Sequence, residues 1–305
     1  MDFLQFFSSA LLIYFGADLI IKHGKELALS FGIPKYIIGL TLISFGTSFP
    51  ELVVNLNASL INESSIAIGN IVGSNIANIT LVLPCAVLIL PLTVKKINFD
   101  ILSFFLLSAA VLYIFCLDGY VSRVEGFLFI SAFILFCIRI KGDTNKKTSS
   151  KQKQAKFDYL SLIILFLSFI VLIIGSNLFI ESAISVADKL GVSKVVISLT
   201  MVALGTSLPE LATSVVAAIK REHGLLIGNI IGSNIMNILL VLAASALVNE
   251  IDVVVDHLAL ILMFSSTILI YIYSIYKITL SKIVGFTLLL IYFIFNYSLF
   301  INNKI

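Results

Sequence analysis

Two short stretches of the sequence carry acids and hydroxyls inside long apolar runs. GTSFPEL begins at Gly46 and GTSLPEL begins at Gly205, and each places a glutamate directly after a proline. The proline lacks an amide hydrogen and its ring clashes with the carbonyl four residues earlier, so each run predicts a broken helix. In a bilayer, the carbonyls freed by such a break must face protein, water or a bound ion.

The side chains at each break are spaced to share one neighbourhood. Thr47, Ser48 and Glu51 lie on adjoining helix faces by i,i+3 and i,i+4 spacing. The second break repeats them as Thr206, Ser207 and Glu210, and free carbonyls are expected around Ser44–Thr47 and Ala203–Thr206. A proline alone is compatible with a packing kink. A charge at the bilayer centre, however, costs at least about 2.5 kcal/mol and marks an ion or substrate path.

A second pair of motifs adds amides and further hydroxyls. GNIVGSNIANI begins at Gly69 and GNIIGSNIMNI at Gly228. Each predicts an i,i+4 stripe on one helix face: Asn70, Ser74 and Asn78 in the first, and Asn229, Ser233 and Asn237 in the second. Their Gly-xxx-Gly spacing favours close helix contact. We assign Ser74, Asn78, Ser233 and Asn237 to the site. Asn75 and Asn234 fit a helix-joining role as well as a ligand role.

The donors in these motifs are all oxygens, which is the ligand set of a hard cation. His23, His223 and His257 are expected at loops, and Cys85, Cys116 and Cys137 form no cluster, so the cysteines are interpreted as free buried thiols. Two carboxylates supply a charge of −2, which one Ca²⁺ balances, as do several Na⁺. A site that is neutralised in two alternative ways suits an exchanger, because bare acids would stall in apolar surroundings.

The chain is predicted to be an all-α multi-pass membrane protein. It is 59% hydrophobic and only 12% charged, about half the charged fraction of a soluble domain. Apolar runs predict ten transmembrane helices. Their approximate bounds are 3–21, 34–61, 65–92, 98–117, 123–140, 158–182, 193–219, 224–248, 256–276 and 281–302.

Every motif residue recurs at an offset of 159, as Glu51 and Glu210 do, which indicates an internal duplication. The halves are 1–140 and 158–305, joined by a Lys-rich linker at 141–157. Because each half has an odd number of spans, the two must be inverted, with broken helices meeting at the midplane. A duplication that merely builds a symmetric scaffold is the alternative, but the repeated residues are polar.

The distribution of lysine and arginine residues predicts the orientation of the chain in the membrane. With the N-terminus outside, sixteen of them fall on the inner side and four on the outer side, which follows the positive-inside rule. Both termini are therefore expected outside, with the linker in the cytoplasm.

At these motifs the sequence resembles the cation/calcium exchanger superfamily, in particular the prokaryotic sodium/calcium exchangers with two inverted alpha repeats. The resemblance covers essentially the whole chain. It implies alternating access with three Na⁺ entering for one Ca²⁺ leaving, and sliding of the first and sixth spans across the rest. Some relatives and the potassium-dependent exchangers have aspartate where Asn237 stands, so potassium coupling is disfavoured here.

The resemblance also implies a metal-ligand set. Glu51 and Glu210 would bind Ca²⁺ with oxygens from Thr47 and Thr206, and would share their carboxylates with Na⁺. Further Na⁺ ligands would be Ser48, Ser74, Asn78, Ser207, Ser233 and Asn237, with backbone oxygens near Ser44 and Ala203.

The expected function is a secondary antiporter in a prokaryotic plasma (inner) membrane, not an enzyme. Its partners are the lipid bilayer and the transported ions Ca²⁺ and Na⁺. No cofactor and no nucleic acid are expected, and it should function as a monomer. The rivals are a Ca²⁺/H⁺ antiporter with the same glutamates as proton carriers, a passive cation channel and a purely structural membrane protein.

Overall fold

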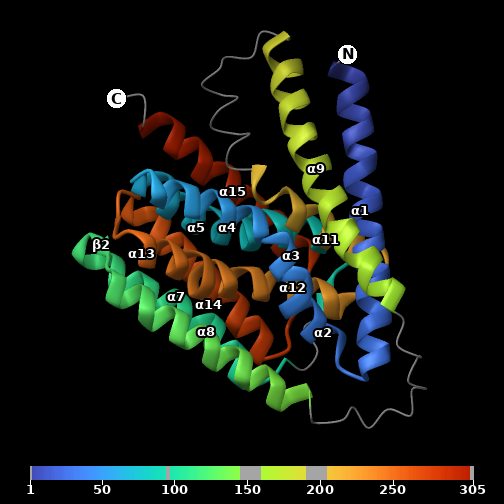
Figure 1. The fold of residues 1–305 in the computed structure, drawn as a ribbon, viewed down its shortest axis with the longest axis horizontal. Coiled ribbons are helices and arrows are strands. Elements are labelled where there is room, and N and C mark those ends of the chain that lie inside the picture. The colour runs from blue at the N-terminus through green and yellow to red at the C-terminus, as the bar shows by residue number, and fades with distance from the viewer. Residues whose placement is uncertain (1, 94–96, 145–158, 190–204, 303–305) are drawn as a thin grey trace.

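The computed structural model describes residues 2–93, 97–144, 159–189 and 205–302, and its elements are almost all helical (Figure 1). In the first half these are α1 (Asp2–Phe31), α2 (Lys35–Ile38), η1 (Gly39–Ile43), α3 (Ser44–Thr47), α4 (Phe49–Leu60), α5 (Ser64–Ala77), η2 (Asn78–Val82), α6 (Leu83–Ile89), α7 (Phe99–Phe115), η3 (Cys116–Asp118) and α8 (Arg123–Thr144). In the second half they are α9 (Tyr159–Lys189), α11 (Leu208–Ile219), α12 (His223–Met236), η4 (Asn237–Leu242), α13 (Ala243–Val248), α14 (His257–Ile275) and α15 (Lys282–Asn302).

Most of the long helices are apolar enough to cross a bilayer. Among the described residues seven single helices meet that condition, and the bent pair Lys35–Thr47 and Phe49–Leu60 makes an eighth. Of the other two predicted spans, α8 is a helix of 22 residues, and α11 is the helix described within 193–219. The prediction of ten spans is compatible with this architecture, and the observed bounds lie within a few residues of it in most cases.

The first span is longer than predicted. The apolar run ends near residue 21, but α1 continues to Phe31, so the prediction that His23 lies in a loop was wrong. The extension packs on the core, where Leu27 and Ala28 are buried. Its polar residues find partners: His23 contacts Glu26 at 2.8 Å and Lys25 contacts Glu222 at 2.7 Å. The helix stops at Gly32, whose φ of 63° favours glycine.

The duplication is visible in the bounds of the elements. Adding 159 to the bounds of α4 gives those of α11, and adding it to those of α5 gives those of α12. Asn62 and Arg221, which are equivalent, both adopt a positive φ. The two halves therefore fold alike, down to the turn that joins α4 to α5 and α11 to α12.

Two short antiparallel ladders connect the halves, and they are also related by the offset. β1 (Leu92–Thr93) pairs with β4 (Thr279–Leu280), and β2 (Tyr120–Val121) pairs with β3 (Ile251–Asp252). Leu92 opposes Leu280, and the equivalent residues Ile251 and Val121 oppose each other. Each half thus contributes one strand to each ladder, as expected for two related halves arranged about a pseudo-twofold axis.

Helices α1 and α9 lie side by side at the edge of the molecule, as a pair set apart from the main bundle (Figure 1). They cross at two equivalent glycines. A Cβ on Gly16 would meet the backbone of Leu172, and one on Gly175 would meet Leu12 and Ile13. The absence of side chains at these positions lets the two backbones approach closely.

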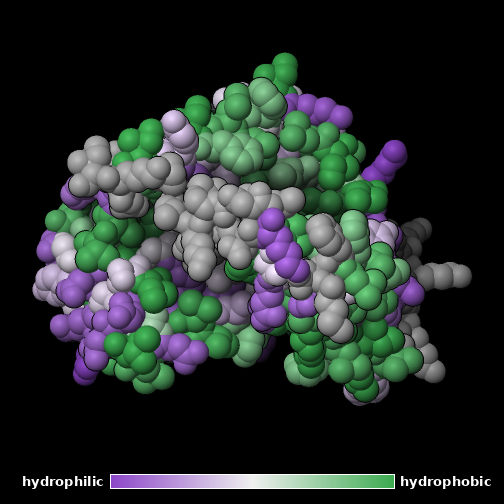
Figure 2. All heavy atoms as spheres, turned by 90° about the horizontal axis from the view of Figure 1, so that it is seen from above, coloured by the Kyte–Doolittle hydropathy of each residue, from purple (hydrophilic) through white to green (hydrophobic). Residues whose placement is uncertain are grey.

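The remaining helices form the core that holds the motifs. Gly228 and Gly232 of α12 lie against Tyr36 and Leu40, where a Cβ would clash with backbone atoms, so the predicted close contact is confirmed for this motif. Large apolar side chains cover much of the outer surface (Figure 2), as is expected of a protein whose solvent is lipid.

Candidate functional site

The two glutamates occupy equivalent places at the start of equivalent helices. Glu51 lies in the first turn of α4 and Glu210 in the first turn of α11, after Ser48 and Ser207 as N-caps. Both carboxylates are 1% exposed. Pro50 and Pro209 stand at the first turns of these helices, where a missing amide hydrogen is tolerated. The positive ends of two helix dipoles therefore lie beside two buried acids.

The two breaks meet inside the protein. Ser48 of the first half donates a hydrogen bond of 3.1 Å to Glu210 Oε1 of the second. Ser48 is also the N-cap of α4, the helix that carries Glu51 in its first turn. Ser233 lies beside the Glu210 carboxylate without making a well-formed hydrogen bond to it. The structure thus brings the two predicted acids into one polar centre.

The predicted amides begin irregular helical turns next to this centre. Asn78 starts the π-helical turn η2, and Asn237 starts its equivalent η4. Ser44 directly follows a third π turn, η1. Wider turns of this kind displace backbone and side chains from the regular ladder and are frequent at functional sites. Asn78, Asn237 and Ser44 are all at most 1% exposed.

The predicted hydroxyls also lie at this centre, and one predicted ligand position falls outside the described residues. Ser74 and Thr206, from different halves, lie 3.4 Å apart between their hydroxyl oxygens. Thr47, Ser207 and Ser233 are buried. Ala203, predicted as a source of a backbone ligand, lies outside the described residues.

The expectation of unpaired carbonyls was wrong for Ser44. The break is a bend of 46° between α3 and α4, and α3 keeps its last turn, so the Ser48 amide donates to Ser44 O at 2.9 Å. The Gly46 carbonyl, in contrast, faces a proline at the fourth following residue and has no amide to accept from. A carbonyl oxygen has two lone pairs, and the Thr47 hydroxyl lies 3.3 Å from Ser44 O as a second donor.

Several buried polar atoms of the centre have no hydrogen-bond partner among the described residues. They are both carboxylate oxygens of Glu51, Oε2 of Glu210, the side-chain oxygens and nitrogens of Asn78 and Asn237, and the hydroxyls of Ser207 and Ser233. Orphaned buried acceptors are rare in proteins unless they serve a ligand or an ion. Carboxylate, amide and hydroxyl oxygens in one buried place fit hard cations.

Two asparagines join the halves but were not in the predicted ligand set. Thr47 donates to Asn229 Oδ1 at 3.2 Å, and Thr206 donates to Asn70 Oδ1 at 3.1 Å. Both asparagines were placed on the polar stripes, yet nothing in the sequence shows that each contacts the opposite half. Of the two amides for which a helix-joining and a ligand role were both considered, Asn234 donates to Ile230 O of its own helix at 2.8 Å, so this bond does not join helices. Asn75 has no hydrogen-bond partner among the described residues.

The histidines and cysteines are the remaining residue types that could bind a metal. No group of three or more histidine, cysteine or acidic residues is found within the described part of the chain. His223 and His257 are the first residues of α12 and α14. The three cysteines are free, but Cys137 is exposed, so the prediction that all three are buried was wrong.

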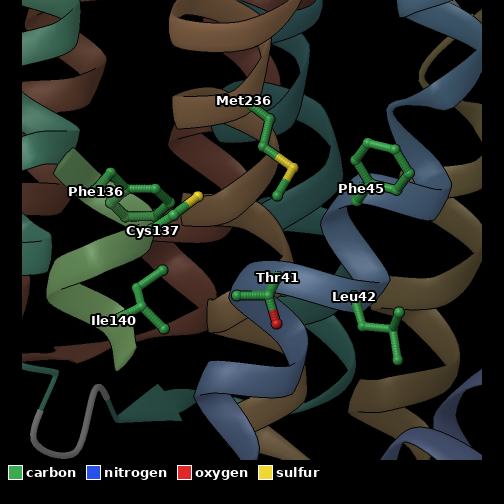
Figure 3. Close-up of a pocket in the computed structure, with 7 residues that line it drawn as sticks. All are labelled: Thr41, Leu42, Phe45, Phe136, Cys137, Ile140 and Met236. Atoms are coloured by element: carbon green, nitrogen blue, oxygen red, sulfur yellow. The ribbon is translucent and has the colours of Figure 1, made fainter. Parts of the chain in front are cut away.

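A lateral pocket of about 340 Å³ lies beside the centre but is not the cation site (Figure 3). It is lined by Thr41, Leu42, Phe45, Phe136, Cys137, Ile140 and Met236, so its surface is almost entirely apolar. Ser44 donates to the Met236 sulfur at 3.4 Å, which makes this side chain part of the wall between the pocket and the polar centre. A cation without oxygen ligands has no reason to occupy this pocket.

Comparisons with known proteins agree with this arrangement. The family model described as sodium/calcium exchanger protein matches residues 1–141 and 160–301. The inner membrane protein YrbG of Escherichia coli is 34% identical over 259 residues, 79% of each chain. The sodium/calcium exchanger MaX1 of Methanosarcina acetivorans is 31% identical over 284 residues, 78% of this chain and 80% of that one.

A solved structure shares the whole fold. The sodium-calcium exchanger NCX_Mj, in a structure soaked with zero Na⁺ and Ca²⁺, superposes with a TM-score of 0.85 at 30% identity and covers 98% of both chains. Together with the match of the family model to nearly the full length, this shows that the chain is a multi-pass membrane protein of the sodium/calcium exchanger family.

Proposed function

We propose that the protein exchanges Na⁺ for Ca²⁺ across the plasma membrane as a secondary antiporter. One observation carries the proposal: two buried glutamates from related halves lie in one polar centre, linked by the hydrogen bond from Ser48 to Glu210. At the coarser level, family and fold make it a transporter of the cation/Ca²⁺ antiporter type and not a classical enzyme.

The charge of the centre supplies the coupling. Two carboxylates in a buried place need compensating cations, because ions without partners cost several kcal/mol each in apolar surroundings. One Ca²⁺ neutralises them, and so do Na⁺ ions at the ligands named above. The loaded forms can then change conformation, whereas the bare form cannot, so each direction of the cycle requires an ion.

The conformational change is proposed to be a sliding of the α1 and α9 pair across the core. The close glycine crossing of these helices supports movement as one unit. The halves 1–140 and 158–305 would provide the inverted geometry, with both termini outside and the linker 141–157 in the cytoplasm. A stoichiometry of three Na⁺ to one Ca²⁺ moves one net charge, which is worth about 2.3 kcal/mol per 100 mV of membrane potential.

Flux measurements on purified protein in liposomes test the proposal. A Na⁺ gradient with the pH clamped on both sides should drive uptake of radioactive Ca²⁺, and K⁺ should have no effect because Asn78 and Asn237 are neutral. Uptake that follows a proton gradient and ignores Na⁺ would instead establish the Ca²⁺/H⁺ rival. Flux that needs no counter-ion would establish a channel.

A further inference from the structure

We propose that Asn55 and Asn70 form a positioning pair that fixes the direction of the Thr206 hydroxyl, so that its oxygen is held as an acceptor for a transported cation. The inference rests on the proposed function, because it assumes that Thr206 takes part in cation binding. Asn55 is on α4, Asn70 is on α5, and Thr206 belongs to the break of the opposite half.

The direction of this relay is set by a backbone carbonyl. Asn55 Nδ2 donates to Ala67 O at 2.9 Å, and a carbonyl only accepts, so the Asn55 amide has one possible orientation. Its Oδ1 therefore accepts from Asn70 Nδ2, at 2.5 Å. With its nitrogen engaged there, Asn70 presents Oδ1 to Thr206, and the Thr206 hydroxyl must donate across the 3.1 Å between them.

The consequence falls on the Thr206 oxygen. A hydroxyl has one proton and two lone pairs, and the proton is committed to Asn70. What remains is acceptor capacity, available to a cation or to the Ser74 hydroxyl 3.4 Å away. Preorganised acceptors bind more tightly because no reorientation is needed when the ion arrives.

The equivalent relay in the second half is anchored through a hydroxyl. Asn229 lies between Thr47, at 3.2 Å, and two hydroxyls, Thr213 at 3.1 Å and Ser214 at 3.5 Å. The Thr213 hydroxyl donates its proton to Pro209 O at 2.8 Å, so it accepts from Asn229 Nδ2, and Asn229 Oδ1 faces Thr47. The Thr47 hydroxyl also has Ile43 O at 3.1 Å and Ser44 O at 3.3 Å as other acceptors.

The two relays differ at two equivalent positions. By the offset of 159, Asn55 corresponds to Ser214 and Val54 to Thr213. Asn55 and Ser214 are both fully buried, so neither is a surface substitution. The first relay is thus directed by an amide bonded to Ala67 O, and the second by a hydroxyl bonded to Pro209 O.

The chain itself supplies the test. Asn55→Ser removes the amide that orients Asn70, and Asn57→Ser, at an exposed position of the same helix, is the matched control. Binding of radioactive Ca²⁺ to detergent-purified protein should weaken about three- to tenfold in Asn55→Ser, the effect of one hydrogen bond, and stay unchanged in the control. Maximal flux at saturating Ca²⁺ should be kept.

A double-mutant cycle separates positioning from a general structural role. On a Thr206→Val background, which lacks the hydroxyl, Asn55→Ser should weaken Ca²⁺ binding no further. Equal weakening with and without the Thr206 hydroxyl would overturn the proposal, as would unchanged binding in Asn55→Ser. If Asn55→Ser does not fold, Asn70→Ser removes the acceptor of the Thr206 hydroxyl itself and must show the same dependence on Thr206.

The Ca²⁺-binding assay needs no counter-ion. It therefore tests the relay even if flux shows H⁺ in place of Na⁺ as the coupling ion. The failure of Na⁺ coupling and the failure of the relay are thus separate results.

Discussion

The corner between α11 and α12 and the equivalent corner between α4 and α5 share a backbone but not their side chains. Each has a residue of positive φ followed by a glutamate as N-cap, Arg221 and Glu222 in one and Asn62 and Glu63 in the other. The α11–α12 corner makes several ion pairs. At the α4–α5 corner, Asn249 donates to Asn62 Oδ1 at 2.6 Å.

The ion pairs of the α11–α12 corner hold α1 against the core. Lys220 contacts Asp18 of α1 at 2.6 Å, and Glu222 contacts Lys25 of α1 at 2.7 Å and Lys35 of α2 at 2.6 Å. The equivalents of Asp18, Lys25 and Lys220 are uncharged, namely Asn177, Ile184 and Ile61, so the pairs that tie α1 to the corner cannot be repeated at the α4–α5 corner.

The comparison shows that, after the duplication, the residues of the polar centre stayed the same in both halves, whereas the residues of the two corners changed. Acids and hydroxyls at the breaks are identical in both halves, whereas the side chains of the two corners have diverged. The centre is constrained by the ion, because both halves must supply ligands to the same site. The ends are free to set how firmly each side is held.

The largest effect is expected at the shared centre. Glu51→Gln or Glu210→Gln should each reduce Na⁺-driven Ca²⁺ uptake roughly 100-fold, since a charged ligand is lost. Glu63→Gln, at the exposed N-cap of α5, is the control and should keep the parental rate. Wild-type uptake in both central variants would favour a purely structural membrane protein.

A nearly complete arrest is expected from tying α1 to the α11–α12 corner. Asp18→Cys with Lys220→Cys, in a protein whose native cysteines are replaced by alanine, should lose uptake when a short thiol-reactive cross-linker joins the pair, and recover after reductive cleavage. The reason is that sliding must separate α1 from the corner.

Lys35→Cys with Glu222→Cys is the matched control for the cross-link, because both residues belong to the core side of the interface. Lys35 packs on α12 at Gly224, so joining it to Glu222 should leave uptake unchanged. Full activity of the cross-linked Asp18 and Lys220 pair would show that α1 does not move relative to this corner.

Much of this architecture was accessible from the sequence, because its signals are strong and local. The duplicated motifs, the apolar runs and the offset of 159 predicted the broken helices, the spans and the pairing of Glu51 with Glu210. Residues such as Pro50 act on their own helix, and apolar length is set by the bilayer.

What the sequence could not provide depends on contacts between distant residues. The extension of α1 past residue 21 contacts Glu222 through Lys25, and Asn70 contacts Thr206, and neither contact is visible in the local sequence. The π turn at Asn78 has no composition signal of its own. The Ser44 carbonyl is occupied because α3 completes its last turn before the bend, which the proline position alone does not show.

A smaller effect is expected from removing one ion pair of the corner. Lys220→Ile, which installs the residue of the equivalent position, removes a partly exposed pair worth about 0.2–1 kcal/mol. Release of α1 should favour the conformation open to the cytoplasm, so half-saturation by cytoplasmic Ca²⁺ should fall up to about fivefold.

Inside-out vesicles give this half-saturation directly. Lys220→Arg keeps the charge and should behave as the parent. A rise in half-saturating Ca²⁺ in Lys220→Ile would show that the pair favours the opposite conformation.

The smallest effect concerns the pH dependence of the same corner. Burial alone would raise the pKa of the Glu222 carboxyl, but hydrogen bonds and charges from Lys25 and Lys35 outweigh it and hold the pKa below its ordinary value of 4.5. A depressed pKa contributes stability above the unfolded pKa, and that stability is lost as the pH falls through the folded pKa.

Thermal unfolding of detergent-purified protein should show this loss as a decreasing difference in unfolding temperature between the parent and Glu222→Gln. At neutral pH the parent should unfold at a higher temperature than Glu222→Gln, and the difference should shrink only below about pH 4.5, where the carboxyl takes up its proton. Glu63→Gln corrects for the loss of a glutamate at an equivalent N-cap. A gap that stays constant down to about pH 3 would mean that Glu222 stabilises the corner by its shape, and the two corners would then differ in packing and not in charge.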